Sequence, residues 1–173
     1  MKENLKMDKI NLKNDRTITL LEEVKLQAEI VIPIYTKLKE LYGIEQATTI
    51  IRNAIAEWYN DRYVKMASSI EGSAYEKWAA MMSDLSSKGG GGVVEVEWIE
   101  NTPSKVVINV TKCKYAEHFK MINQPELGTF ICCDVDRHIA KAAGITSKTE
   151  VEIKRTKTIM EGAASCDLCC LFK

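Results

Sequence analysis

The sequence predicts an α+β protein in which N-terminal helices pack on a roughly four-stranded antiparallel sheet with short helical insertions. Apolar residues recur at three- and four-residue steps over residues 17–85, and after a glycine run at 89–92 the apolar period changes to two. With 173 residues, 46% of them hydrophobic, the chain suits one domain with a real core. We expect these parts: a disordered arm (1–15) and a single domain (16–173) with a helical half (16–88) and a β-rich half (92–173).

Three helices are expected in the first half. The first begins at Thr17 or Thr19 as N-cap, should be kinked by Pro33 and ends at Gly43. The second covers residues 47–59, with an extension through Tyr63, and the third covers residues 73–85. We expect four of their large side chains to fill the core rather than to line a cofactor site: Trp58, Tyr59, Trp78 and Met82.

Residues 86–92, SSKGGGG, are typical of a flexible connector, with a mobile flap or an anion-holding loop as the alternative. Residues 93–100 and 105–112 alternate in polarity around the turn NTPS, which predicts an antiparallel hairpin with one wet face. The remaining expected elements are a helix over 114–122, a helix centred on 134–143 and stopped by Gly144, a strand over 149–160 and a final strand over 166–172.

The composition excludes several partner classes. The chain has 24 basic and 24 acidic residues, scattered along its length, so neither a nucleic acid nor an anionic membrane is an expected partner. No apolar run approaches the roughly 20 residues of a membrane span, and the polar N-terminus lacks the apolar region of a secretory signal. We therefore expect a cytoplasmic protein, in which most thiols are reduced.

All six cysteines follow residue 112, which suggests that the C-terminal part builds something from thiols. Cys166 and Cys169 have the C-x-x-C spacing of zinc ligands, but no suitable second pair exists, because Cys132 and Cys133 are adjacent. We therefore expect no metal site. Packing as small hydrophobic side chains is expected for Cys132, Cys169 and Cys170.

Three cysteines are stronger candidates for catalysis, because each begins or ends an element beside titratable groups. Cys113 precedes a predicted helix, whose N-terminus should lower the pKa of its thiol. The titratable neighbours in sequence are Glu117 and His118 for Cys113, Asp136 for Cys133, and Asp167 for Cys166.

Four short pieces of the C-terminal half carry a more specific signal. They are T-K-C-K-Y (111–115), P-E-L-G (125–128), C-x-x-D (133–136) and T-x-x-x-G-x-x-x-C-D (158–167). On these pieces, residues 105–170 resemble the L-2-amino-thiazoline-4-carboxylic acid hydrolase family. The chain differs from that pattern in having Leu168 where an aromatic residue is usual.

The resemblance implies a hydrolase that opens a five-membered thiazoline ring with water to give N-carbamoyl-L-cysteine, without a cofactor. Such a reaction needs a nucleophile, groups that move protons and a cation for the substrate carboxylate. We expect Cys113 or Cys166 to be the nucleophile, His118, Asp136 or Glu161 to move protons, and Asp167 to orient a base. Cys133 is expected to belong to the same catalytic group. The expected substrate-binding residues are Arg155 or Arg137 for the carboxylate, Tyr115 and Thr158.

Other interpretations stay open at this point. In a rival mechanism, the thiols only shape a soft pocket for sulfur, and an activated water attacks. A second class of function is non-catalytic binding of a small molecule, by a module similar to domains related to vinyl-reductase and vesicle-tethering components. A third is a thiol-based metal sensor. A small-molecule substrate is the expected partner, and the apolar helical surface would also permit a homodimer.

Overall fold

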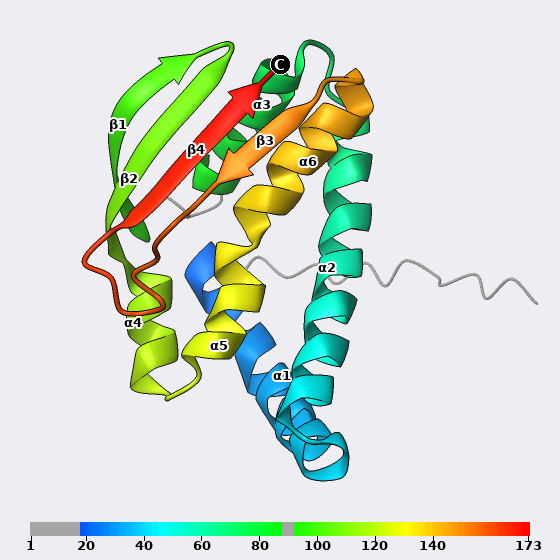
Figure 1. Cartoon of the computed structure of the whole chain (residues 1–173), viewed down its shortest axis with the longest axis vertical. Coiled ribbons are helices and arrows are strands. Elements are labelled where there is room, and N and C mark those ends of the chain that lie inside the picture. Colours follow the sequence, from blue (N-terminus) through cyan, green and yellow to red (C-terminus); the bar gives the residue numbers. More distant parts are fainter. Residues whose placement is uncertain (1–17, 88–91) are drawn as a thin grey trace, which may run out of the picture.

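The computed structural model describes residues 18–87 and 92–173. The predicted arm (1–15) and the centre of the predicted glycine connector (88–91) lie outside the described residues. The α+β arrangement is confirmed: N-terminal helices come first, and a four-stranded antiparallel sheet is built from the second half of the chain (Figure 1). No helix in the described ranges is both long enough and apolar enough to cross a membrane.

The first three helices are α1 (Leu20–Tyr42), α2 (Ile44–Ser68) and α3 (Ala74–Leu85). Thr19 caps α1 in a capping box with Glu22, and Gly43, at φ +80°, ends it, so both predicted boundary signals of this helix are confirmed. Helix α2 is longer than predicted at both ends. Ser73 caps α3 in a second capping box, which confirms the predicted start of that helix.

The sheet has the order β1-β2-β4-β3. Its strands are β1 (Val94–Thr102), β2 (Lys105–Cys113), β3 (Val151–Lys154) and β4 (Cys166–Phe172). The predicted hairpin is confirmed by the β1–β2 pairing, and β4 inserts between β2 and β3 with Val110 opposite Cys166. This register brings the C-terminal end of β2 beside the first residue of β4.

The segment between β2 and β3 contains α4 (Lys114–Met121), α5 (Pro125–Gly128), the π-helical turn η2 (Thr129–Cys133) and α6 (Val135–Ser147). The prediction that Gly144 stops the last helix is wrong, because Gly144 lies inside α6. A Cβ atom at Gly144 would lie 2.8 Å from the carbonyl oxygen of Thr149, so a glycine is needed for close packing. The helix ends instead near Lys148, which has a left-handed φ of +55°.

The strand observed in place of the one predicted over residues 149–160 has 4 residues, a third of the expected length. Strand β3 ends at Lys154, and the backbone N–H groups of Thr156 and Lys157 then donate to the Asp167 carboxylate at 2.9 and 2.8 Å. A side chain thus takes the hydrogen bonds that a longer strand would give to its neighbour. A turn follows, in which the backbone N–H of Glu161 donates to the hydroxyl of Thr158 at 3.0 Å.

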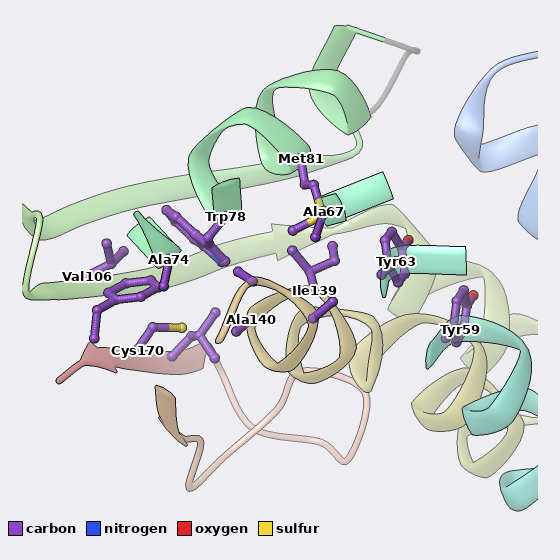
Figure 2. Close-up of a cluster of buried hydrophobic side chains, with 14 of the residues drawn as sticks. Tyr59, Tyr63, Ala67, Ala74, Trp78, Met81, Val106, Ile139, Ala140 and Cys170 are labelled. Carbon is purple, nitrogen blue, oxygen red and sulfur yellow. The ribbon is translucent and has the colours of Figure 1, made fainter. Parts of the chain in front are cut away.

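Two clusters of buried side chains form the core. The first lies between the sheet and helices α2, α3 and α6; Figure 2 shows Cys170 and Val106 of the sheet close to Trp78 of α3 and Ala140 of α6. Packing is therefore confirmed for Cys170, which is fully buried. The second cluster joins α1, α4, α5 and η2 around Phe119 and Leu127, below the sheet in Figure 1.

Candidate functional site

A cavity of about 210 Å³ opens between these two clusters, where α1, α2 and η2 meet the lower end of the sheet in Figure 1. Most of its wall is apolar, and the aliphatic part comes from α1, α3, η2, α6 and the sheet. Residues of this aliphatic part are Leu20, Val24, Met82, Leu85, Val94, Val96, Ile108, Val110, Ile131, Val135 and Leu168. The chemistry of the cavity therefore depends on the few polar and sulfur-containing side chains that interrupt this wall.

Four cysteines from three places in the chain line the cavity: Cys113, Cys132, Cys133 and Cys166. Cys113 ends β2, Cys166 begins β4, and the antiparallel register brings these two strand ends together. Cys132 and Cys133 come from η2, whose Asp134 N–H donates to the Thr129 carbonyl at 3.0 Å in the i to i+5 pattern of a π turn.

The environment of three of these thiols favours the neutral form. Burial raises the pKa of Cys113, which is the N-cap residue of α4, and the backbone N–H groups of Ala116 and Tyr115 only partly oppose this shift. The predicted helix N-terminal position of Cys113 is thus confirmed, but the predicted lowering of its pKa is wrong because desolvation outweighs the helix dipole. Burial also raises the pKa of Cys132 well above its usual value and that of Cys133 to about 12.

Cys166 also has a backbone donor at its sulfur. Its Sγ accepts a hydrogen bond from the backbone N–H of Ile159 at 3.1 Å, which fixes the position of the thiol at the start of β4. Cys113 has comparable donors in the backbone N–H groups of Ala116 and Tyr115.

Arg155 and Asp136 form the charged part of the inner wall. The guanidinium of Arg155 donates to the Asp136 carboxylate through Nη2 and to the carbonyl oxygen of Cys133 through Nη1. The Arg155 side chain is 9% exposed and the Asp136 side chain 29% exposed, so the carboxylate is the more accessible member of the pair. Burial raises the pKa of Asp136 against the opposing charge of Arg155, and the charge of Asp136 raises the pKa of Arg155 although burial alone would lower it.

The sequence also matches a known protein family. The model of the family described as L-2-amino-thiazoline-4-carboxylic acid hydrolase matches residues 23–170, most of the chain. The chain belongs to this family. No curated protein matches the chain at a significant level.

In this L-2-amino-thiazoline-4-carboxylic acid hydrolase family member, the cavity brings together six of the residues singled out from the sequence. These are Cys113, Tyr115, Cys133, Asp136, Arg155 and Cys166. They come from six separate elements or loops, and the family match includes all of them. Their roles in a reaction stay predictions.

The other five predicted residues do not line the cavity. Exposed Arg137 lies 4.0 Å from Asp134, and His118 packs edge-on against Phe119, where burial lowers its pKa. Thr158 is buried and donates to exposed Glu161 at 2.7 Å, within the turn before β4. Asp167 is a structural acceptor: burial alone would raise its pKa, but the hydrogen bonds from Thr156 and Lys157 bring it to about 2.

Sequence reasoning missed the side chains that α1 and α2 contribute to the cavity. Trp58, expected in the core, is 47% exposed and lines the cavity together with Arg62 and Glu23. Cys132, expected only to pack, is also part of the wall. The i, i+4 spacing of Trp58 and Arg62 places them on one face of α2, and this spacing was the available signal.

Metal ligation has little geometric support in the part of the chain that the structure describes. Within residues 18–87 and 92–173, no three His, Cys, Asp or Glu side chains converge in the manner of a metal site.

Proposed function

We propose that the protein hydrolyses a small cyclic C–N/C–S compound such as L-2-amino-thiazoline-4-carboxylate in the cysteine-lined cavity, giving N-carbamoyl-L-cysteine. One observation carries the proposal: Cys113, Cys133 and Cys166 meet Asp136 and Arg155 around one cavity, in a chain of the corresponding family. A nucleophile, a proton carrier and a fixed cation within one partly desolvated space are what such a ring opening requires.

The reaction consumes one water. Its oxygen bonds to the carbon between the ring sulfur and the two nitrogens, and the bond from that carbon to the ring sulfur breaks. One water proton goes to the departing sulfur, and the other stays on the nitrogens of the urea product. Catalysis therefore needs help for attack at that carbon and a proton for the leaving thiolate.

Cys166 is the best candidate for the nucleophile. Its Sγ lies in the cavity wall and is positioned by the Ile159 N–H, whereas burial raises the pKa of Cys113 and Cys133 and so favours their thiol forms. Attack of its Sγ on the ring carbon would break the ring C–S bond and leave a cysteinyl isothiourea. Water would then add to the same carbon and displace Cys166, with Asp136 relaying the protons in both steps.

The rival mechanism uses a water that ionised Asp136 activates, with the thiols only shaping the pocket. The two mechanisms differ in which substitution abolishes turnover. Both lose activity in Asp136→Asn, but only the covalent mechanism loses it in Cys166→Ser.

The test incubates the purified full chain with L-2-amino-thiazoline-4-carboxylate and quantifies N-carbamoyl-L-cysteine by mass spectrometry. Cys166→Ser should reduce turnover by at least about 100-fold. The matched control is Cys169→Ser, on the opposite face of the same strand and outside the cavity wall, which should retain turnover. Absence of product with the wild-type chain contradicts the proposal, and unchanged turnover in Cys166→Ser removes the covalent mechanism.

A second candidate function is non-catalytic binding of a small apolar or sulfur-containing molecule. The raised pKa values of Cys113, Cys132 and Cys133 favour it, because neutral thiols make a soft, passive wall. Calorimetric titration separates the two functions: saturable binding of the thiazoline with no product on prolonged incubation supports the binding module.

A further inference from the structure

We infer that Arg62, stacked on Trp58 at the exposed end of the cavity, binds a carboxylate of the substrate and thereby selects acidic heterocycles over neutral ones. The inference deepens the proposed function and rests on it. It replaces Arg155 and Arg137, the two cations that the sequence suggested for this task.

The position of Arg62 supports this assignment. Its side chain lines the cavity and is 40% exposed, so it is open both to solvent and to a ligand. Its Cζ lies 5.2 Å from the centre of the Trp58 ring, a cation–π contact that restricts the position of the guanidinium. A contact with an aromatic ring uses none of the N–H donors, so these are left for a bidentate contact with a carboxylate.

The existing partner of Arg62 is loosely held. Nη1 of Arg62 lies 3.7 Å from Oε1 of Glu23, which is too far for a hydrogen bond, and the same oxygen accepts a hydrogen bond from Gln27 at 3.2 Å. An incoming carboxylate can therefore form hydrogen bonds with Arg62 that Glu23 does not form in this structure. Glu23 keeps Gln27 as a partner in that case.

Arg155 is less suited to the same task. It is the other basic residue of the cavity wall in the described chain, but its guanidinium contacts Asp136 and the Cys133 carbonyl, and only 9% of its side chain is exposed. Asp136 also neutralises its charge, so a second carboxylate would be repelled there. Arg137 lies outside the cavity wall.

The test compares L-2-amino-thiazoline-4-carboxylate with 2-amino-2-thiazoline, the same ring without the carboxylate, as substrates and as calorimetric ligands. Arg62→Gln should raise KM and Kd for the acid about 10- to 100-fold, the range expected for a lost charge-assisted contact, while kcat changes less than about threefold. Values for the neutral ring should not change. Arg62→Lys should recover part of the loss, and Lys65→Gln, an exposed cation on the same helix outside the cavity wall, is the matched control.

The outcomes separate this inference from the proposed reaction. If the wild-type chain binds the acid without turning it over, the proposed hydrolysis fails, and the Kd values still report on Arg62. Equal loss for the two ligands in Arg62→Gln, no loss for either, or a wild-type chain without preference for the acid overturns the inference. Circular dichroism and thermal unfolding of each variant show whether the fold is intact.

Discussion

The carboxylate of Asp167 accepts hydrogen bonds from both the backbone N–H and the hydroxyl of Thr156, at 2.9 and 2.7 Å. Thr156 follows Arg155 in the chain, and Asp167 follows Cys166. This contact therefore connects the segment that carries Arg155 to the segment that carries Cys166, the proposed nucleophile. Asp167 acts on the cavity through its neighbours, since its own side chain is not part of the wall.

Asp167→Asn should lower turnover severalfold while reducing the free energy of unfolding by only about 1 kcal/mol at pH 7. The pKa of Asp167 is depressed to about 2, so the ionised carboxylate stabilises the fold above the unfolded-state pKa near 4, and that contribution is lost as pH falls toward 2. Urea unfolding at pH 7 and pH 3 checks this. The difference between variant and wild type should shrink at pH 3, and a constant difference would contradict the assignment.

Arg155→Met should destabilise the fold by about 2 kcal/mol, because it leaves Asp136 without its cation. The pKa of Asp136, already raised by burial, should rise further. A carboxyl with a raised folded-state pKa stabilises the fold while protonated, and this contribution is lost as pH rises through that pKa. The loss should therefore be larger at pH 8 than at pH 5 in urea unfolding.

The control for Arg155→Met is Lys154→Met, which removes the neighbouring exposed cation and should change the free energy of unfolding by less than about 0.5 kcal/mol. An equal loss for Arg155→Met at both pH values would show that packing, rather than the Asp136 charge, explains the effect.

Thiol alkylation should distinguish the cavity cysteines. With a pKa of about 12, Cys133 is almost wholly protonated at pH 7.5, so iodoacetamide should modify it far more slowly than a free cysteine, with a rate that rises about tenfold per pH unit. Cys113, whose pKa burial also raises, should likewise react more slowly than a free cysteine. Peptide mass spectrometry over time gives the rates, and rapid modification of Cys133 at neutral pH would refute the burial argument.

Gly128→Ala should destabilise the fold by about 1–3 kcal/mol, the usual cost of overpacking. A Cβ atom at this position would lie 2.6 Å from Cε of Met160 and 2.6 Å from Cγ of Phe119. A double-mutant cycle with Met160→Ala checks the cause, since Gly128→Ala should cost less once the Met160 side chain is shortened. Strict additivity of the two losses would indicate a different origin.

The sequence was sufficient for the features that depend on local chemistry. The capping signal at Thr19 and the alternating hairpin predicted their elements correctly, because caps and period-two patterns act over a few residues. Gly144 was misinterpreted because its packing against Thr149 involves a residue beyond the helix end. Strand β3 was predicted too long because the competing acceptor, Asp167, lies 11 residues away from Thr156.

The candidate site also has a part that sequence patterns predict and a part that they do not. Family-specific spacing singled out Cys113, Cys133, Cys166 and Asp136, whereas the pairing of Arg155 with Asp136 was not predicted. The pKa directions of Cys113 and Asp136 depend on burial, which no sequence pattern reports. The i, i+4 spacing of Trp58 and Arg62 indicates a shared helix face, but it does not show that this face reaches the cavity, which depends on tertiary packing.

The π turn at η2 holds one residue more than an α-helical turn would need. Each residue of an α-helix turns the chain by about 100°. If the chain were one residue shorter at η2 and the neighbouring helices kept their positions, different side chains would face the cavity. The presence of Cys132 and Cys133 in the cavity wall thus depends on the extra residue in this turn. Loss of a single residue at η2 would therefore be enough for the same fold to bind a chemically different small molecule.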